Sequence, residues 1–83
     1  GTAEINRVLE RAVEAHAPRA TRGKPPRFFY ATQTGTAPPV VTLFASAPDK
    51  VAPEYERYLY NCFRRAFDLR GTPLQIKIRK REH

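Results

Sequence analysis

The chain has 83 residues, of which 41% are hydrophobic, and this is enough for one small domain with a single core. Lys and Arg number 15 against 8 Asp and Glu, and the net charge of +7 favours polyanionic partners such as nucleic acid or an anionic membrane surface. One cysteine, Cys62, excludes an internal disulfide and a thiolate zinc cluster. No apolar run approaches the roughly 20 residues that span a bilayer, and no secretion signal is present, so we expect a cytoplasmic protein with no membrane partner.

The first segment has apolar residues at helical spacing, which predicts an amphipathic helix from about residue 3 to residue 16 with Thr2 as its N-cap. These apolar residues are Ile5, Val8, Leu9, Ala12 and Val13. Pro18 ends the helix, and the following stretch to residue 27 contains several cations and no acid. We therefore predict a basic loop with the cations Arg19, Arg22, Lys24 and Arg27.

A hairpin is predicted next, with strands over residues 27–33 and 40–45. The connection over residues 34–39, which contains Gly35 and two prolines, is too long for a two-residue turn. The second strand is apolar almost throughout, and such a strand needs cover on both faces. We therefore expect a partner outside the chain to dock on this part of the sheet.

A second helix is predicted from Pro53, and Gly71 and Pro73 close the segment. Its apolar stripe should form the spine of the core and comprises Tyr55, Tyr58, Leu59, Cys62, Phe63, Ala66 and Phe67. A last strand follows, because Leu74, Ile76 and Ile78 alternate with Gln75, Lys77 and Arg79.

The predicted fold is an α+β two-layer sandwich in the order α-β-β-α-β, with a three-stranded sheet and both helices on one sheet face. The other face then stays uncovered. Strict alternation along the first strand would place Phe29, Ala31 and Gln33 on the uncovered face. The basic residues of the last strand would join them, so we expect an open face that is both aromatic and cationic.

No catalytic constellation or Walker motif can be assembled from the residues, so we expect no enzyme activity, no metal site and no cofactor in this chain. Two clusters of cations are candidates for RNA phosphates, although ordinary solubilising charge is the alternative. One is the basic loop, and the other is the C-terminal cluster of Lys77, Arg79, Lys80 and Arg81. Phe29 or Tyr60 could offer a ring on which a base stacks.

A family resemblance runs through the whole chain. Its marks are residues 5–9, 12–18, 22–24, 30–33 with Pro38-Pro39, 43–44, 55, 57–59, 65–67, 71–74 and 79–82. In these segments the sequence resembles the C-terminal KH-like domain of the Der (EngA) family of bacterial GTPases, which have two consecutive G domains.

The resemblance implies that residues 1–83 form one KH-like domain of a larger GTPase, whose two G domains lie outside this chain and bind the GTP and Mg²⁺. It implies a non-catalytic, regulatory domain, monomeric by itself, that docks on ribosomal RNA during assembly of the large ribosomal subunit. The alternative is a purely intramolecular interaction with a G domain that regulates GTP turnover, with Phe29, Gln33 and Tyr60 as contact candidates.

One departure from RNA-gripping KH domains bears on the mechanism. Such domains clamp the RNA backbone with a Gly-x-x-Gly loop, and residues 47–53, the corresponding stretch, contain no glycine. Binding would then depend on phosphate contacts and on RNA shape, which position a protein but read little sequence.

Overall fold

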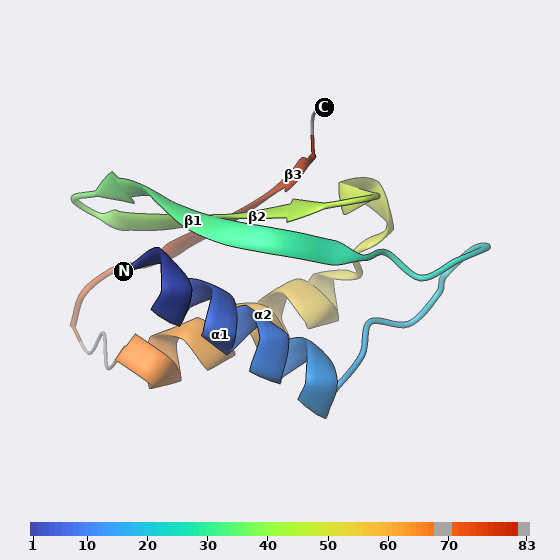
Figure 1. Ribbon diagram of the computed structural model, residues 1–83, viewed down its shortest axis with the longest axis horizontal. Coiled ribbons are helices and arrows are strands. Elements are labelled where there is room, and N and C mark those ends of the chain that lie inside the picture. The colour runs from blue at the N-terminus through green and yellow to red at the C-terminus, as the bar shows by residue number, and fades with distance from the viewer. Residues whose placement is uncertain (68–70, 82–83) are drawn as a thin grey trace.

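The computed structural model describes residues 1–67 and 71–81. In these ranges the elements are α1 (Thr2–Ala15), β1 (Phe28–Thr36), β2 (Pro39–Ala45), the 3₁₀ turn η1 (Pro48–Lys50), α2 (Pro53–Phe67) and β3 (Gln75–Lys80). The predicted α+β fold and the order α-β-β-α-β are confirmed (Figure 1).

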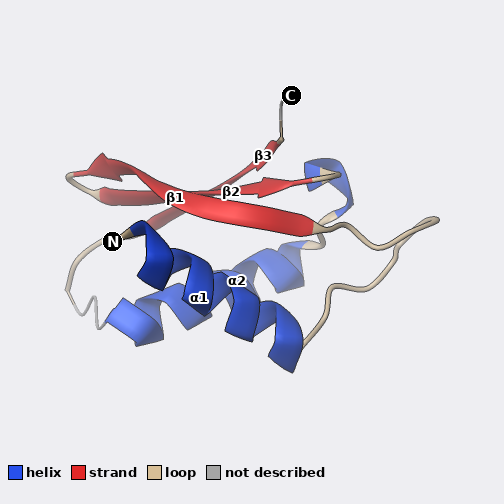
Figure 2. Cartoon of the chain, in the orientation of Figure 1, coloured by secondary structure: helices blue, strands red, loops and turns tan. Residues whose placement is uncertain are grey.

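The three strands form one sheet in the order β1-β2-β3, so β2 is central. β1 pairs with β2 antiparallel through the hairpin, and β3 pairs with β2 parallel after the crossover through α2. Both helices lie on one face of the sheet, as predicted, and no described helix covers the other face (Figure 2). We call that other side the open face.

The core lies between the helices and the sheet. Leu59 and Phe63 of α2 and Leu43 of β2 are completely buried, which confirms α2 as the spine of the core. Its other buried members are Ile5, Leu9, Ala12, Ala31, Val41 and Leu74. Burial of this kind contributes about 1.5–3 kcal/mol for each large apolar side chain, and it opposes the conformational entropy of a chain this short.

The hairpin is tighter than the sequence predicts. β1 continues to Thr36 and pairs there with Pro39, so only Ala37 and Pro38 connect the strands, through a cis peptide bond. The expected long connection was therefore wrong, because residues 34–36 and 39 join the ladder. The N-cap of α1 is Gly1, with no side-chain cap, and not the predicted Thr2.

A bulge in β1 changes which aromatic residue reaches the open face. Phe28 pairs with Ala45 and Tyr30 with Phe44, so Phe29 is the extra residue between two pairs. The insertion reverses the alternation that the sequence suggests. Ala31, expected on the open face, is completely buried beneath the helices.

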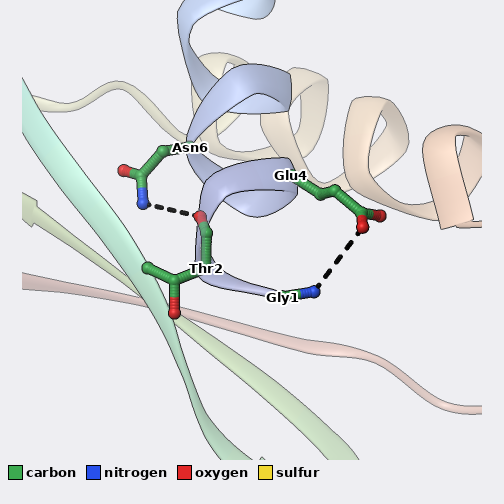
Figure 3. A network of polar contacts seen from close by, with 4 residues as sticks. All are labelled: Gly1, Thr2, Glu4 and Asn6. Carbon is green, nitrogen blue, oxygen red and sulfur yellow. Dashed lines mark hydrogen bonds and ion pairs between the residues drawn. The ribbon is translucent and has the colours of Figure 1, made fainter.

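Asn6 ties α1 to the outer edge of β1. Its side-chain oxygen accepts a hydrogen bond of 2.7 Å from the Ala31 N–H, and its amide nitrogen donates to the Ala31 carbonyl at 2.8 Å. The same nitrogen donates to the Thr2 carbonyl at 2.9 Å (Figure 3). Asn6 thus pairs with β1 as a neighbouring strand would, and closes the edge at this point.

Two tyrosines of α2 hold the C-terminal end of α1. The Tyr55 hydroxyl donates to the His16 carbonyl at 2.7 Å, and the Tyr58 hydroxyl donates to the Ala12 carbonyl at 2.6 Å. The His16 carbonyl follows the end of α1, where a helix lacks its own partners, whereas the Ala12 carbonyl also accepts the His16 N–H at 3.1 Å. Burial raises the pKa of Tyr55 to about 12, with a smaller contribution from Tyr58, and burial likewise raises the pKa of Tyr58.

Candidate nucleic-acid interface

The open face carries an aromatic row that crosses all three strands. Tyr30 of β1 pairs with Phe44 of β2, which pairs with Arg79 of β3. The Tyr30 and Phe44 rings are stacked, with centroids 4.7 Å apart and an interplanar angle of 22°. We call these three residues the aromatic row. A guanidinium therefore stands at the β3 end of a two-ring stack.

The next row on this face, two residue pairs along, is polar. Thr32 pairs with Thr42, which pairs with Lys77 of β3. The Thr42 hydroxyl lies 2.9 Å from that of Thr34, so this part of the hairpin is held by a cross-strand hydrogen bond. Lys77 and Arg79 are both exposed. The prediction that Lys77 and Arg79 share one side of the sheet is therefore confirmed, because Ile76 and Ile78, which alternate with them, pack against the core.

Phe29 lies between two arginines that are far apart in the sequence. The guanidinium carbon of Arg81 is 3.8 Å from the centre of the Phe29 ring, and that of Arg27 is 5.6 Å from the same centre. The ring is partly buried. The expectation that Phe29 would be exposed was wrong, because the two side chains cover it through cation–π contacts.

The two predicted cation clusters meet only in part. Arg27 and Arg81 share the Phe29 ring, and Lys80 ends β3 beside them. The other cations of the basic loop, Arg19, Arg22 and Lys24, are exposed on the segment between α1 and β1, which extends beyond the two layers (Figure 1). They therefore form a positively charged loop that is separate from the cations of β3.

Among the described residues, the net charge of the side chains is located entirely on these two clusters. The helical elements α1, η1 and α2 carry six cations and six acids, so their charges cancel. The rest of the described chain carries eight cations and no acid, namely Arg19, Arg22, Lys24, Arg27, Lys77, Arg79, Lys80 and Arg81. No ion pair to the cations of β3 occurs among the described residues. The sheet layer is therefore purely cationic.

The other contact candidates lie elsewhere. Gln33 does not reach the open face, because it pairs with Val41, whose side chain is in the core. It lines an apolar groove of about 270 Å³, formed with Ile5, Phe67 and neighbouring residues. The sequence placed Gln33 on the wrong face for the same reason as Ala31.

Tyr60 lies on the helix side, beside β3. It is partly buried against the core and lines a groove of about 310 Å³ together with Pro53, Arg57 and Ile76. The Arg64 guanidinium carbon lies 5.7 Å from the centre of its ring. The ring of Tyr60 therefore lies against the core beside β3 and away from the open face.

The Tyr30–Phe44 pair was not predicted from the sequence. A signal existed, because two aromatic residues flank the hairpin at positions that its register brings opposite each other. The register could not be read from the sequence, since it depends on the two-residue turn and on the irregularity between Gln33 and Gly35.

Two further classes of site were searched in the described ranges, 1–67 and 71–81. No group of three or more His, Cys, Asp or Glu side chains is arranged there to hold a metal ion. No helix in these ranges combines the length and the apolarity that crossing a membrane requires.

Comparison with known proteins agrees with the fold. The family described as "KH-domain-like of EngA bacterial GTPase enzymes, C-terminal" matches residues 1–79. The chain is 47% identical over 81 residues to the GTPase Der of Geobacter metallireducens, covering 98% of this chain and 18% of that protein. It is 46% identical over 81 residues to the GTPase Der of Thiobacillus denitrificans, covering 98% of this chain and 17% of that protein.

A third relative, the GTPase Der of Syntrophotalea carbinolica, is 45% identical over 80 residues, which cover 96% of this chain and 18% of that protein. The chain thus spans less than a fifth of the length of these relatives, and it corresponds to their C-terminal KH-like domain and not to a G domain. The chain belongs to the family of C-terminal KH-like domains of the EngA, or Der, GTPases.

Proposed function

We propose that this domain docks its parent GTPase on ribosomal RNA during assembly of the large ribosomal subunit, in the bacterial cytoplasm. The observation that carries the proposal is the separation of charge between the two layers. The helical elements are neutral in sum, whereas the sheet layer and the basic loop hold eight cations and no acid among the described residues. A surface of one sign attracts a polyanion and gains affinity through counterion release.

The domain contributes binding and no chemistry of its own. GTP and Mg²⁺ would be bound by the G domains of the parent. The stretch between β2 and α2, which in RNA-gripping KH domains holds the Gly-x-x-Gly clamp, is here the turn η1 followed by Pro53, with no glycine. Phosphate contacts from the open face and the basic loop would therefore replace the clamp.

Filter binding of this domain to large-subunit RNA across a salt series tests the proposal. The variant removes the exposed cations Lys77, Arg79 and Lys80 by substitution with Ala. The control substitutes Ala for Arg7, Arg11 and Arg65, which are exposed cations of the helices, and so loses the same charge.

Each phosphate contact that is lost should reduce the slope of log K against log salt by about 0.7–0.9. We expect the sheet variant to lose about two units of slope and the helix variant to keep nearly all of it. Equal losses in the two variants would show that net charge alone matters and would contradict docking through the open face. The absence of any salt slope in the unmodified domain would contradict RNA docking altogether.

A second candidate function is packing on a G domain of the same polypeptide, which would regulate GTP turnover. It is favoured by the apolar groove that Gln33 lines between the start of α1 and the end of α2. Gln33→Arg places a charge at this groove, and Gln75→Arg on β3 adds the same charge elsewhere. GTP turnover of the intact GTPase should change with the first variant and not with the second. Equal turnover in both would count against this function.

A further inference from the structure

Tyr30 stands out among the side chains of the open face. Among the described residues it is the one large apolar side chain that is exposed, at 42%. Its ring stacks on Phe44, and neither residue belongs to the core cluster or packs against it. The core therefore does not account for the pair, and one ring face of the stack is left to solvent.

A hollow adjoins this stack. It measures about 520 Å³ and is lined by Tyr30, Phe44, Arg79 and Lys80. Its volume lies within the roughly 300–1,000 Å³ of sites that hold small molecules. Of the four residues that line it, two are aromatic and two are cationic. Proteins that bind single-stranded nucleic acid use the same combination, because rings stack on bases and cations neutralise phosphates.

Arg81, the cation that follows Lys80 in the chain, is held in place at two points. Arg81 follows β3, and its N–H donates to the Ala45 carbonyl at 3.1 Å, which extends the pairing by one residue. Its guanidinium rests on the Phe29 ring at 3.8 Å. A guanidinium held by a ring loses less freedom when it binds a phosphate, and its fork of donors matches phosphate oxygens.

These observations favour an unpaired nucleotide over other occupants. A base inside a duplex is already stacked on its neighbours and cannot lie on a protein ring, whereas an unpaired base can. An apolar protein partner would cover the rings, but it would bury Arg79 and Lys80 without a countercharge. This chain supplies none beside them, because its strands contain no acid. RNA supplies both the flat ring and the negative charge.

We propose that the aromatic row is a stacking site for an unpaired RNA base, with the flanking phosphates bound by Arg79, Lys80 and Arg81. This inference deepens the proposed function and rests on it. It adds a contribution to affinity that does not depend on salt. It also assigns the contact to the open face of the sheet, and not to the groove between α2 and β3 that Tyr60 lines.

The experiment measures fluorescence polarisation of this domain with a labelled single-stranded RNA of eight nucleotides and with an RNA duplex that has the same number of phosphates. The variant is Tyr30→Ala. The two controls are Tyr30→Phe, which keeps the ring, and Tyr60→Ala, which removes a tyrosine from the helix side.

Tyr30→Ala should weaken single-strand binding by about 5- to 100-fold, the range expected for one stacked base, with an unchanged salt slope and unchanged duplex binding. Tyr30→Phe and Tyr60→Ala should stay within about twofold of the unmodified domain. Equal binding by Tyr30→Ala and the unmodified domain, or a loss confined to Tyr60→Ala, would overturn the inference.

Photocrosslinking of the unmodified domain with a 4-thiouridine oligonucleotide gives an answer even if Tyr30→Ala fails to fold. Crosslinks at Tyr30 or Phe44 are expected, and crosslinks confined to α2 would overturn the inference. Its failure is distinguishable from failure of the proposed function. If only the stacking is wrong, Tyr30→Ala binds the single strand as tightly as the unmodified domain and with the same salt dependence, whereas if RNA docking is wrong, the unmodified domain binds neither RNA.

Discussion

Asn6→Ala should be among the most destabilising single substitutions outside the apolar core. The side chain makes three hydrogen bonds of 2.7–2.9 Å, two of them to the backbone of Ala31, which is completely buried. Removing the amide leaves the N–H and the carbonyl of Ala31 without their partner. An unsatisfied buried group costs about 1–3 kcal/mol, whereas the higher helix propensity of Ala returns about 0.5 kcal/mol.

We therefore expect a loss of about 2–3 kcal/mol in the free energy of unfolding, and a fall of roughly 10–20 °C in Tm for a domain of this size. Urea denaturation of Asn6→Ala measures the loss, with Asn61→Ala, an exposed asparagine of α2, as the control. The amide of Ala31 should also exchange with solvent much faster in the variant. A loss below about 0.5 kcal/mol relative to the control would refute the role of this side chain.

Two further predictions concern pH and packing. The pKa of Tyr55 is raised to about 12 and that of Tyr58 is also raised. Their neutral forms therefore stabilise the fold fully below pH 10, which is the ordinary pKa of a tyrosine in the unfolded chain. The free energy of unfolding should fall as the pH rises from 10 towards 12. Over this range the urea midpoint should fall less steeply with pH in the double variant Tyr55→Phe/Tyr58→Phe than in the unmodified domain, and an equal pH dependence would refute this. A methyl group added at Gly35 would lie 2.9 Å from Cγ2 of Val40, so Gly35→Ala should cost about 1–2 kcal/mol. Most of that cost should disappear in a Val40→Ala background, and a double-mutant cycle without coupling would contradict the crowding.

The elements could be predicted from the sequence because their signals are local. Apolar spacing and the alternation of the last strand place both ends of α1, the start of α2 and both ends of β3 within one residue of their observed positions. Which side chains of β1 face the helices could not be predicted in this way. Phe28, Phe29 and Tyr30 are similar in size and polarity, so nothing within the strand shows which one is the extra residue of the bulge. Pairing with β2 decides it, and pairing is not local.

Asn6 and Phe29 show what else a sequence leaves open. Asn6 lies inside α1, where asparagine is unfavourable. An asparagine at such a position indicates a specific side-chain contact, so this contact was predictable in principle. For Phe29 no signal existed, since its cover comes from Arg81, more than fifty positions away in the chain. The contact of Arg27 and Arg81 with one ring is therefore a property of the fold.

The cationic sheet layer also bears on the stability of the domain. Lys77, Arg79 and Lys80 lie within one short strand, well inside a Debye length of about 8–10 Å, and no described acid offsets them there. Their mutual repulsion opposes folding in the absence of a partner, and salt or a bound polyanion relieves it. RNA that binds only the folded domain should therefore raise its Tm in proportion to the logarithm of RNA concentration. The same charges that weaken the free domain would then stabilise it on RNA, which gives a reason for their separation from the acids of the helices.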